Sequence, residues 1–398
     1  MMIVVRSIGK VHAAGIGRIS PSLLPVRSPL VASTQIANLT SPTLHRQEEQ
    51  KVKPWPYKER VYNQFWQFFD HTSKRFTDNS RIIVVDGNIA SGKTEFAKQV
   101  AESFDLHYMP DIHPDEVWFR DNGFDMRELD DQFTQPANVS YDLKKFLSDP
   151  DPKKSLKLGR PQMLLYQLRF FNYVSALEHL LNTGQGVVME RSVYSDMVFA
   201  EVFTQLGYMR PQALQYYTNM LRKYTICDLW KPHLFIYLDA PIPYLRERIN
   251  KRRIPYEVNS PVLTDDFLRR IDKVYKEKLF PSMKDHSEIL TYDVSNLPDW
   301  EIIVEELEEL NLHKDEENPE KFKVWRQKHE DDFNNYRMVV SMKDTLWPLF
   351  VLEPPLKAPE LMIHGEDFID YERVINGSPA AYYEKGFNPE EKNVMFKL

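Results

Sequence analysis

The sequence contains a single cysteine, Cys227, among 398 residues. A lone cysteine excludes an internal disulfide and any metal site that is built from several thiolates. We expect Cys227 to be a small buried apolar side chain, the usual environment of a free cysteine. The sequence also has no apolar run approaching the roughly 20 residues that cross a bilayer, so we predict no transmembrane segment.

Acidic residues are absent from the first 47 positions, and the first of them is Glu48. The stretch is rich in serine, alanine and other small apolar residues. It carries five cations: Arg6, Lys10, Arg18, Arg27 and Arg46. This composition is typical of a mitochondrial transit peptide, with a disordered basic arm as the alternative. We expect cleavage between residues 25 and 47 and a mature protein in the mitochondrial matrix.

The excess of positive charge that nucleic-acid-binding proteins normally have is also missing. The formal net charge is −7, and removal of the five cations of residues 1–47 would leave −12. This balance argues against a nucleic-acid motor and against nucleic acid as a general partner.

What the sequence does contain is an alternation of buried strands and amphipathic helices. Short apolar runs at 81–86, 186–189, 233–238 and 288–293 are typical of parallel strands that are buried on both faces. Helical spacing of apolar residues occurs at 94–104, 161–182, 210–225, 243–253, 264–278 and 299–310. The alternation predicts a parallel sheet with helices on both faces, and such sheets bind ligands at the carboxyl ends of their strands.

The segments on either side of this core, which we place at residues 80–310, have a different character. Residues 48–79 begin with a charged, proline-containing linker, and 61–76 has helical spacing. The extension at 311–398 has helical spacing at 322–336 and then becomes rich in proline and aromatic residues. It is too apolar for a solvated tail. Packing on partner proteins and packing on its own domain both remain open.

The strongest motif covers residues 87–94 and has the pattern G-x-x-x-x-G-K-S/T between an expected strand and an expected helix. This pattern predicts a P-loop, in which glycines let backbone N–H groups turn toward phosphate. Lys93 supplies positive charge near the phosphates, and Thr94 can ligate Mg²⁺. The predicted nucleotide-phosphate ligands are Gly87, Asn88, Ala90, Ser91, Gly92, Lys93 and Thr94.

Two further groups of polar residues lie at the ends of predicted elements. Glu190 and Arg191 follow a strand, where a carboxylate could hold a metal and a guanidinium could hold phosphate. The helix at 243–253 ends in a cluster of cations. Such a cluster either complements the helix dipole or forms a lid over the transferring phosphate.

Residues 87–94, residues 190–196, and Gln162 seven residues before Arg169 together resemble the deoxynucleoside kinase family over roughly residues 80–300. The resemblance implies an α/β fold of the P-loop type, a three-layer sandwich with a five-stranded parallel sheet. It implies nucleobase contacts from Gln162, Arg169 and Asp196. By the same resemblance, Glu190 and Arg191 lie at Mg²⁺ and the sugar 5′-hydroxyl, Thr94 is a second Mg²⁺ ligand, and Arg252 and Arg253 belong to the lid.

The sequence departs from the family pattern at the catalytic base. The family has a glutamate in a Glu-Pro-Val context, whereas this chain has Asp111 after Met109 and Pro110. Aspartate is one methylene shorter, and a misplacement of about 1 Å can cost roughly 10²-fold in rate. Met197 replaces an arginine, and Ala90 replaces a loop glycine. These departures favour a site that binds nucleotide with little turnover.

A transit peptide and a long C-terminal extension resemble one branch of the family, the accessory subunits of mitochondrial NADH:ubiquinone oxidoreductase (respiratory complex I). This resemblance implies a non-catalytic structural or assembly role, peripheral on the matrix side of the membrane arm, with other complex I subunits as partners. It also implies FAD, although no G-x-G-x-x-G follows a predicted strand. The alternative is an active mitochondrial deoxynucleoside kinase that transfers phosphate from ATP to a deoxynucleoside 5′-hydroxyl.

Overall fold

The computed structural model describes residues 39–40, 52–120, 123–313, 315, 318–327, 329–351 and 354–378. The expected transit peptide therefore lies outside the described residues, apart from Leu39 and Thr40, and so does the chain after residue 378. Within the described ranges, no helix is both long and apolar enough to cross a membrane.

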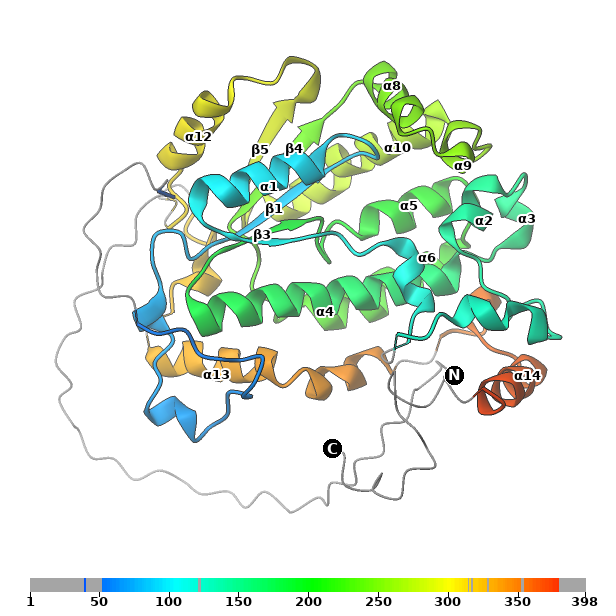
Figure 1. Ribbon diagram of the computed structural model, residues 1–398, viewed down its shortest axis with the longest axis horizontal. Helices are drawn as coiled ribbons and strands as arrows, with labels where there is room; N and C mark the ends of the chain where they lie inside the picture. The colour runs from blue at the N-terminus through cyan, green and yellow to red at the C-terminus, as the bar shows by residue number, and fades with distance from the viewer. Residues whose placement is uncertain are drawn as a thin grey trace.

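A five-stranded parallel sheet forms the centre of the molecule, with strand order β2-β3-β1-β4-β5 (Figure 1). The strands are β1 (Ile82–Gly87), β2 (His107–Met109), β3 (Val187–Glu190), β4 (Leu234–Asp239) and β5 (Glu288–Asp293). Four of them confirm the strands predicted from apolar runs. β2 has no counterpart among those predictions, because it is three residues long and half-exposed.

Helices cover both faces of the sheet. They are α1 (Lys93–Phe104), α2 (Leu143–Ser148), α3 (Pro152–Ser155), α4 (Gly159–Thr183), α5 (Met197–Gln205), α6 (Pro211–Tyr216), α7 (Lys223–Ile226), α8 (Ile242–Arg252), α9 (Pro255–Val258), α10 (Asp265–Val274), α11 (Phe280–Met283), α12 (Trp300–Glu309), α13 (Glu330–Ser341) and α14 (Gly365–Asn376). The π-helical segments η5 (Tyr217–Arg222) and η6 (Tyr275–Leu279) join α6 to α7 and α10 to α11. Cys227 caps α7 at the surface and is exposed, so the prediction that it is buried is wrong.

Alternate residues of β1 face the two helical layers, as the period of a strand requires. Ile83 and Val85 pack in one apolar cluster with residues of α1 and α12. Ile82 and Val84 pack in a second cluster with residues of α4, α5 and α10. These two clusters confirm the predicted three-layer sandwich.

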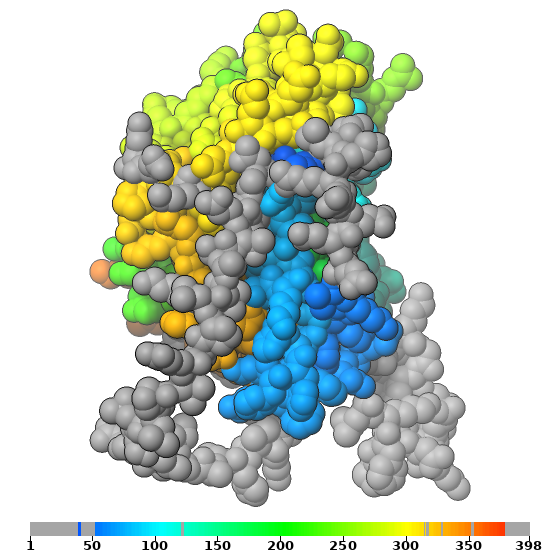
Figure 2. All heavy atoms as spheres, turned by 90° about the vertical axis from the view of Figure 1, so that its left-hand side faces the viewer, coloured from blue at the N-terminus to red at the C-terminus, as the bar shows by residue number. Residues whose placement is uncertain are grey.

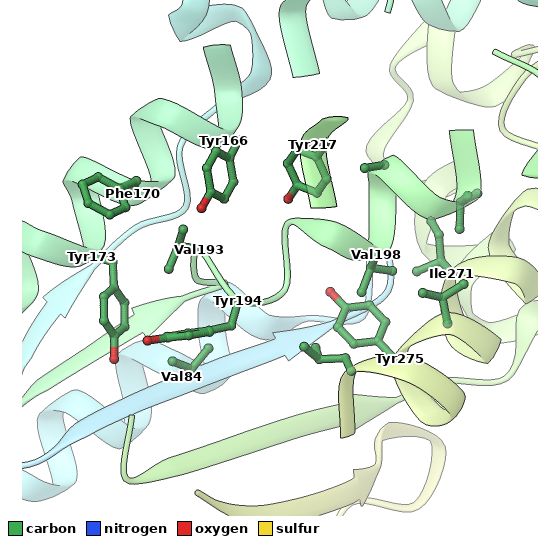
Figure 3. Packing of buried hydrophobic residues seen from close by; sticks show 14 of the residues in the cluster. Val84, Tyr166, Phe170, Tyr173, Val193, Tyr194, Val198, Tyr217, Ile271 and Tyr275 are labelled. Atoms are coloured by element: carbon green, nitrogen blue, oxygen red, sulfur yellow. The ribbon is translucent and has the colours of Figure 1, made fainter. Parts of the chain in front are cut away.

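Tyrosines form much of the core between the sheet and α4 (Figure 3). The rings of Tyr173 and Tyr194 meet edge to face at 5.3 Å. The Tyr173 hydroxyl donates to Trp230 O at 2.7 Å, and the Tyr194 hydroxyl donates to Leu229 O at 3.1 Å. A buried hydroxyl needs such a partner. Because Tyr194 belongs to the loop between β3 and α5, this packing fixes the loop that directly follows Glu190, the last residue of β3.

The segment before the sheet, residues 52–76, which we name the arm, is not helical. It contains the 3-10 turns η1 (Trp66–Phe68) and η2 (Ser73–Arg75), so the prediction of a helix over 61–76 is wrong. The Tyr62 hydroxyl donates to Asp70 O at 3.1 Å. In an α-helix these two residues would lie about 12 Å apart along the axis. The contact between Tyr62 and Asp70 is therefore incompatible with one continuous helix, although the spacing of apolar residues favours one.

The extension packs on its own domain as far as residue 378. Helix α13 runs alongside α4 (Figure 1), and Tyr336 stacks on Trp230 with ring centroids 4.2 Å apart. After α13 comes the 3-10 helix η9 (Lys343–Phe350), whose Phe350 lies 5.0 Å from the ring of Phe170 on α4. The helix predicted at 322–336 is therefore displaced to α13, and α14 has no predicted counterpart.

A buried arginine joins the arm, α4 and α13. Arg337 is fully buried, and its Nη1 donates to Asp70 Oδ2 at 2.6 Å. Its Nε donates to Asn182 Oδ1 on α4 at 2.7 Å. The guanidinium carbon also lies 3.6 Å from the ring centroid of Tyr62. One side chain therefore ties together three parts of the chain that are distant in sequence.

Leu39 and Thr40 are anchored to the core although their neighbours in sequence are not described. Leu39 is fully buried in the cluster that contains Phe104. Asn79 binds the backbone of Thr40 on both sides, since its Oδ1 accepts from Thr40 N and its Nδ2 donates to Thr40 O, each at 2.7 Å. The folded core therefore contains a specific binding site for these two residues.

Candidate nucleotide-binding site

Two glycines shape the loop between β1 and α1. A Cβ on Gly87 would lie 2.6 Å from Ser91 Oγ and 2.9 Å from Leu238 O, so any larger residue would force a shift. Gly92 is the N-cap of α1 and has φ 94°, in the left-handed region that favours glycine. Both glycines of the predicted P-loop therefore have a physical reason to be glycine.

The loop keeps a glycine-like backbone even where the family glycine is missing. Ala90 has φ 64° and is buried, at a cost of roughly 1–2 kcal/mol for a residue with a Cβ. Asn88 anchors the loop, because its Nδ2 donates to Leu268 O on α10 and its Oδ1 accepts from Ile89 N, each at 2.8 Å. The loop conformation is therefore retained at some cost in stability.

Lys93, at the start of α1, is half-buried, and its Nζ lies 3.5 Å from Asn88 O. Burial, with help from the nearby Arg191, lowers the pKa of Lys93 to about 7, although Asp111, Asp86 and Glu190 act in the opposite direction. A bound phosphate would supply the negative charge that this ammonium needs. Binding of an anion such as phosphate beside Lys93 is therefore favourable.

The two predicted Mg²⁺ ligands meet in the structure. Thr94 Oγ1 donates to Glu190 Oε2 at 2.7 Å, and the Tyr108 hydroxyl donates to Glu190 Oε1. A hydroxyl and a carboxylate are oxygen ligands of the kind that Mg²⁺ takes beside nucleotide phosphates. Thr94 and Glu190 therefore fit an ion that also binds the nucleotide, and Tyr108 orients the carboxylate. Among the described residues there is no group of three His, Cys, Asp or Glu that could hold a metal without a ligand's help.

The predicted catalytic base is held between two arginines. Asp111 Oδ2 accepts from Arg191 Nη1 at 2.7 Å, and Asp111 Oδ1 accepts from Arg169 Nη2 at 3.1 Å. Burial acts to raise the pKa of Asp111, but the two guanidinium groups outweigh it and lower the pKa. Since a proton acceptor weakens as its pKa falls, Asp111 is a poor general base in this arrangement.

Arg191 connects this carboxylate to the P-loop. Its backbone has φ 54°, a strained conformation for a residue with a side chain. Its Nη2 donates to Gly87 O at 3.4 Å, and its Nε lies 3.7 Å from Asp86 Oδ1. The guanidinium also lies 4.8 Å from the ring centroid of Phe199. Arg191 is thus fixed beside the phosphate loop, and its role at the sugar 5′-hydroxyl stays a prediction.

The three predicted nucleobase residues also meet. Asp196 Oδ2 accepts from Gln162 Nε2 at 2.8 Å, and Asp196 Oδ1 accepts from Arg169 Nη1 at 2.7 Å. The Tyr217 hydroxyl donates to Asp196 Oδ2 at 2.7 Å, and Figure 3 shows this tyrosine projecting into the core cluster. All these groups are buried and pair with one another. A base can enter only by exchanging some of these hydrogen bonds for its own.

The cation of α8 that lies beside the P-loop is Arg248, whereas the predicted lid residues are Arg252 and Arg253. A Cβ placed on Gly92 would lie 3.6 Å from Arg248 Nη2, so Arg248 faces the start of α1. Its Nη1 donates to the Tyr244 hydroxyl at 3.1 Å. Arg252 instead lies 3.5 Å from Glu257 Oε2, and Arg253 is the left-handed C-cap of α8. A role for these two in a lid remains a prediction.

Comparison with known proteins agrees with this geometry. The family model described as deoxynucleoside kinase matches residues 83–328. The chain belongs to the deoxynucleoside kinase family. The match begins in β1 and ends shortly before α13, so it contains every strand of the sheet and every predicted site residue.

Relatives of two kinds resemble this deoxynucleoside kinase-like chain. NADH dehydrogenase (ubiquinone) 1 alpha subcomplex subunit 10, mitochondrial, of Bos taurus is 34% identical over 323 residues, which is 81% of this chain and 88% of that protein. The subunit of the same name from Mus musculus is 33% identical, with 81% and 84% coverage. Deoxyguanosine kinase of Dictyostelium discoideum is 25% identical over 242 residues, which is 61% of this chain and 74% of that enzyme.

Some site residues of this family member had no signal in its sequence. Tyr108 and Tyr217 hold Glu190 and Asp196 respectively, but single tyrosines in apolar segments carry no motif. Arg248 belongs to a cluster of cations on one helix, where spacing alone does not identify the residue that faces the phosphates. The predicted groups do come together, with the base-reading residues and Asp111 joined through Arg169.

Proposed function

We propose that the chain is an accessory subunit of mitochondrial respiratory complex I, with a kinase-like site that binds a nucleotide and turns it over little. The length of the similarity carries this proposal. The match to the bovine subunit spans 323 residues, whereas the kinase family model spans residues 83–328. The likeness to the subunit therefore extends beyond the kinase-like core.

The proposed location is the matrix side of the inner membrane, peripheral on the membrane arm, with other complex I subunits as partners. The composition of residues 1–47 supports mitochondrial import. The segments outside the kinase-like core support a structural role. Residues 52–76 and α13 pack around this core and contribute no group to the P-loop contacts described above.

The proposed ligand is an adenine nucleotide or a deoxynucleotide, with Mg²⁺. Lys93 and Arg248 would hold phosphate, Thr94 and Glu190 would hold the ion, and Gln162 with Asp196 would face the base. The short, ionised Asp111 between two guanidinium groups supports binding over turnover. FAD forms no part of the proposal, since no G-x-G-x-x-G follows any strand.

Native electrophoresis of gently solubilised mitochondrial membranes tests the assembly. The tagged full-length protein is expected to migrate with NADH dehydrogenase activity, and its depletion is expected to reduce the amount of assembled complex. Migration of all the protein as a small free species would overturn the proposal.

The second candidate, an active deoxynucleoside kinase, is favoured by one observation. Lys93, Thr94, Glu190 and Arg191 all lie around one loop, as phosphoryl transfer requires. The purified mature protein can be assayed with ATP, Mg²⁺ and each deoxynucleoside, beside an Asp111→Glu variant that restores the family residue. Wild-type turnover that disappears in Lys93→Ala would establish the kinase. Nucleotide-induced thermal stabilisation without turnover would support the accessory role.

A further inference from the structure

The arm exposes an unusual concentration of large apolar side chains. Val61, Phe65, Phe68 and Phe69 are 55%, 62%, 75% and 69% exposed, and they occur within nine residues of sequence. We name these four residues the arm face. Single exposed apolar residues are common on proteins, but a contiguous group of this kind marks a surface that is covered in the functional state.

The arm face is ordered, so its exposure does not reflect a loose segment. The Phe65 ring lies 5.3 Å from the Trp66 ring and 5.5 Å from the Phe69 ring. Trp66 in turn packs at 5.2 Å against the buried Trp55. Phe65 and Phe69 therefore belong to one connected group of rings that is anchored in the protein through Trp66 and Trp55.

The buried network of Arg337 holds the arm behind this face. Asp70 directly follows Phe69 and pairs with both Arg337 and Arg75. The Trp55 indole donates to Arg60 O at 2.9 Å. In Figure 2 the arm, in blue, forms a broad surface on this side of the molecule. A rigid apolar surface needs little ordering on association, which lowers the cost of binding.

Charges of both signs border the arm face. The exposed Arg60 guanidinium lies 4.9 Å from the ring centroid of Trp66, so a cation stands at one border of the arm face, although the whole chain has net charge −7. On the other border lie the acids that begin α13, since Gln67 Nε2 donates to Asp331 Oδ1 at 3.4 Å. An anionic bilayer would attract the first border and repel the second. A protein surface can match both.

We propose that the arm face is the docking surface for a neighbouring protein subunit whose matching surface is apolar at its centre and carries a carboxylate opposite Arg60. An apolar centre with a charged rim is the usual anatomy of a protein–protein interface. Aromatic side chains at the centre of such interfaces supply a large share of the binding energy. This docking surface rests on the proposed function, because it takes its partner from the same assembly.

A triple variant tests the arm face in the full-length protein. Phe65→Ser/Phe68→Ser/Phe69→Ser removes exposed rings, so the thermal stability of the purified protein should stay at the wild-type value. The fraction of protein that migrates in the large assembly should fall at least about tenfold, as expected when aromatic anchors are lost. The matched control is Ile302→Ser/Leu356→Ser/Ile369→Ser, which changes three exposed apolar residues elsewhere and should assemble normally.

The outcomes separate this inference from the proposed function. If wild type assembles and the triple variant assembles equally well, the arm face is not the docking surface. If wild type itself stays out of the large assembly, the proposed function fails and this partner fails with it. A triple variant that is thermally destabilised shows that the rings serve the fold, which also overturns the inference.

A photoreactive residue identifies the class of partner. Phe68 is replaced by p-benzoylphenylalanine in the full chain, and mitochondria are irradiated. A crosslink to a defined complex I subunit is expected, and it should weaken several-fold when Arg60→Glu is added but not when the exposed Lys144→Glu is added. A crosslink to lipid alone would overturn the proposal in favour of a membrane contact.

Discussion

Replacing Lys93 by methionine should stabilise the ligand-free protein at neutral and acidic pH while abolishing its response to nucleotide. The pKa of Lys93 falls from its ordinary value of 10.5 to about 7, chiefly because of burial. The unfolded chain therefore holds this proton over a pH range in which the folded protein has released it. Where the unfolded state binds more protons, stability rises with pH. Lys93 thus destabilises the fold most below pH 7, and its penalty disappears as the pH approaches 10.5.

The size of the effect follows from the same numbers. At about 1.4 kcal/mol per pH unit, the full change corresponds to about 5 kcal/mol, which is an upper bound. Because Lys93 retains some access to water, we expect a gain of about 2–3 kcal/mol for Lys93→Met at pH 6. Methionine preserves the length and the apolar packing of the lysine stem, so little else should change.

Urea unfolding of wild type and Lys93→Met at pH 6 and pH 9 measures this directly. The exposed Lys144→Met serves as the control and should show no pH-dependent difference. ATP with Mg²⁺ should raise the melting temperature of wild type but not of Lys93→Met. The reasoning is refuted if Lys93→Met destabilises the protein at pH 6, or if its effect is the same at both pH values.

Three further predictions follow from contacts described above. Arg337→Met should lower the free energy of unfolding by about 3 kcal/mol, since it removes three hydrogen bonds of a charged group in a buried position; a loss below about 1 kcal/mol in urea titrations would contradict the role of Arg337. Arg248→Ala should weaken ATP binding about tenfold by calorimetry, with Arg252→Ala nearer to wild type; the reverse order would show that the lid closes differently. The mature protein should begin at or before Leu39, and mass spectrometry of its N-terminal peptide checks this. A mature protein that begins after Thr40 would contradict the prediction, because cleavage would then have removed both residues from their binding site.

The sheet and the phosphate loop could be predicted because their signals are local. A short β-branched run such as residues 81–86 favours a strand that is buried on both faces, as in the middle of a parallel sheet. The loop at 87–94 has glycines where the backbone turns, so its conformation is set by residue type. The match between predicted and observed strands at β1, β3, β4 and β5 rests on these properties.

The arm and the lid could not be predicted because their conformations are set by distant residues. The spacing of apolar residues at 61–76 favours a helix, yet Tyr62 and Asp70 both contact Arg337. A local sequence pattern cannot predict this contact, because Arg337 is distant in sequence. Likewise, α8 carries cations on several sides, and the direction in which α8 packs decides that Arg248 faces Gly92. Strand β2 is only three residues long, so the periodicity of apolar residues could not predict it.

The base-reading group shows a third kind of limit. Motif positions predict that Gln162, Arg169 and Asp196 contact the nucleobase, and in the structure these three side chains contact one another. That Arg169 simultaneously binds Asp111 could not be inferred from spacing, because it depends on the three-dimensional course of the chain after β2. This shared arginine couples the base-reading carboxylate to the candidate catalytic carboxylate.

The pairing of Asp70 with Arg337 joins residues 267 positions apart, and this separation constrains the order of folding. Contacts between distant residues form late, because the intervening chain must first be organised. A polypeptide that enters a compartment N-terminus first delivers the arm long before α13. Until α13 arrives, Asp70 has only Arg75, and Trp55 and Tyr62 lack the guanidinium against which they pack. The arm therefore cannot complete its native contacts before α13 is present, and a chain that stalls before residue 337 would expose the aromatic residues of the arm to chaperones and proteases.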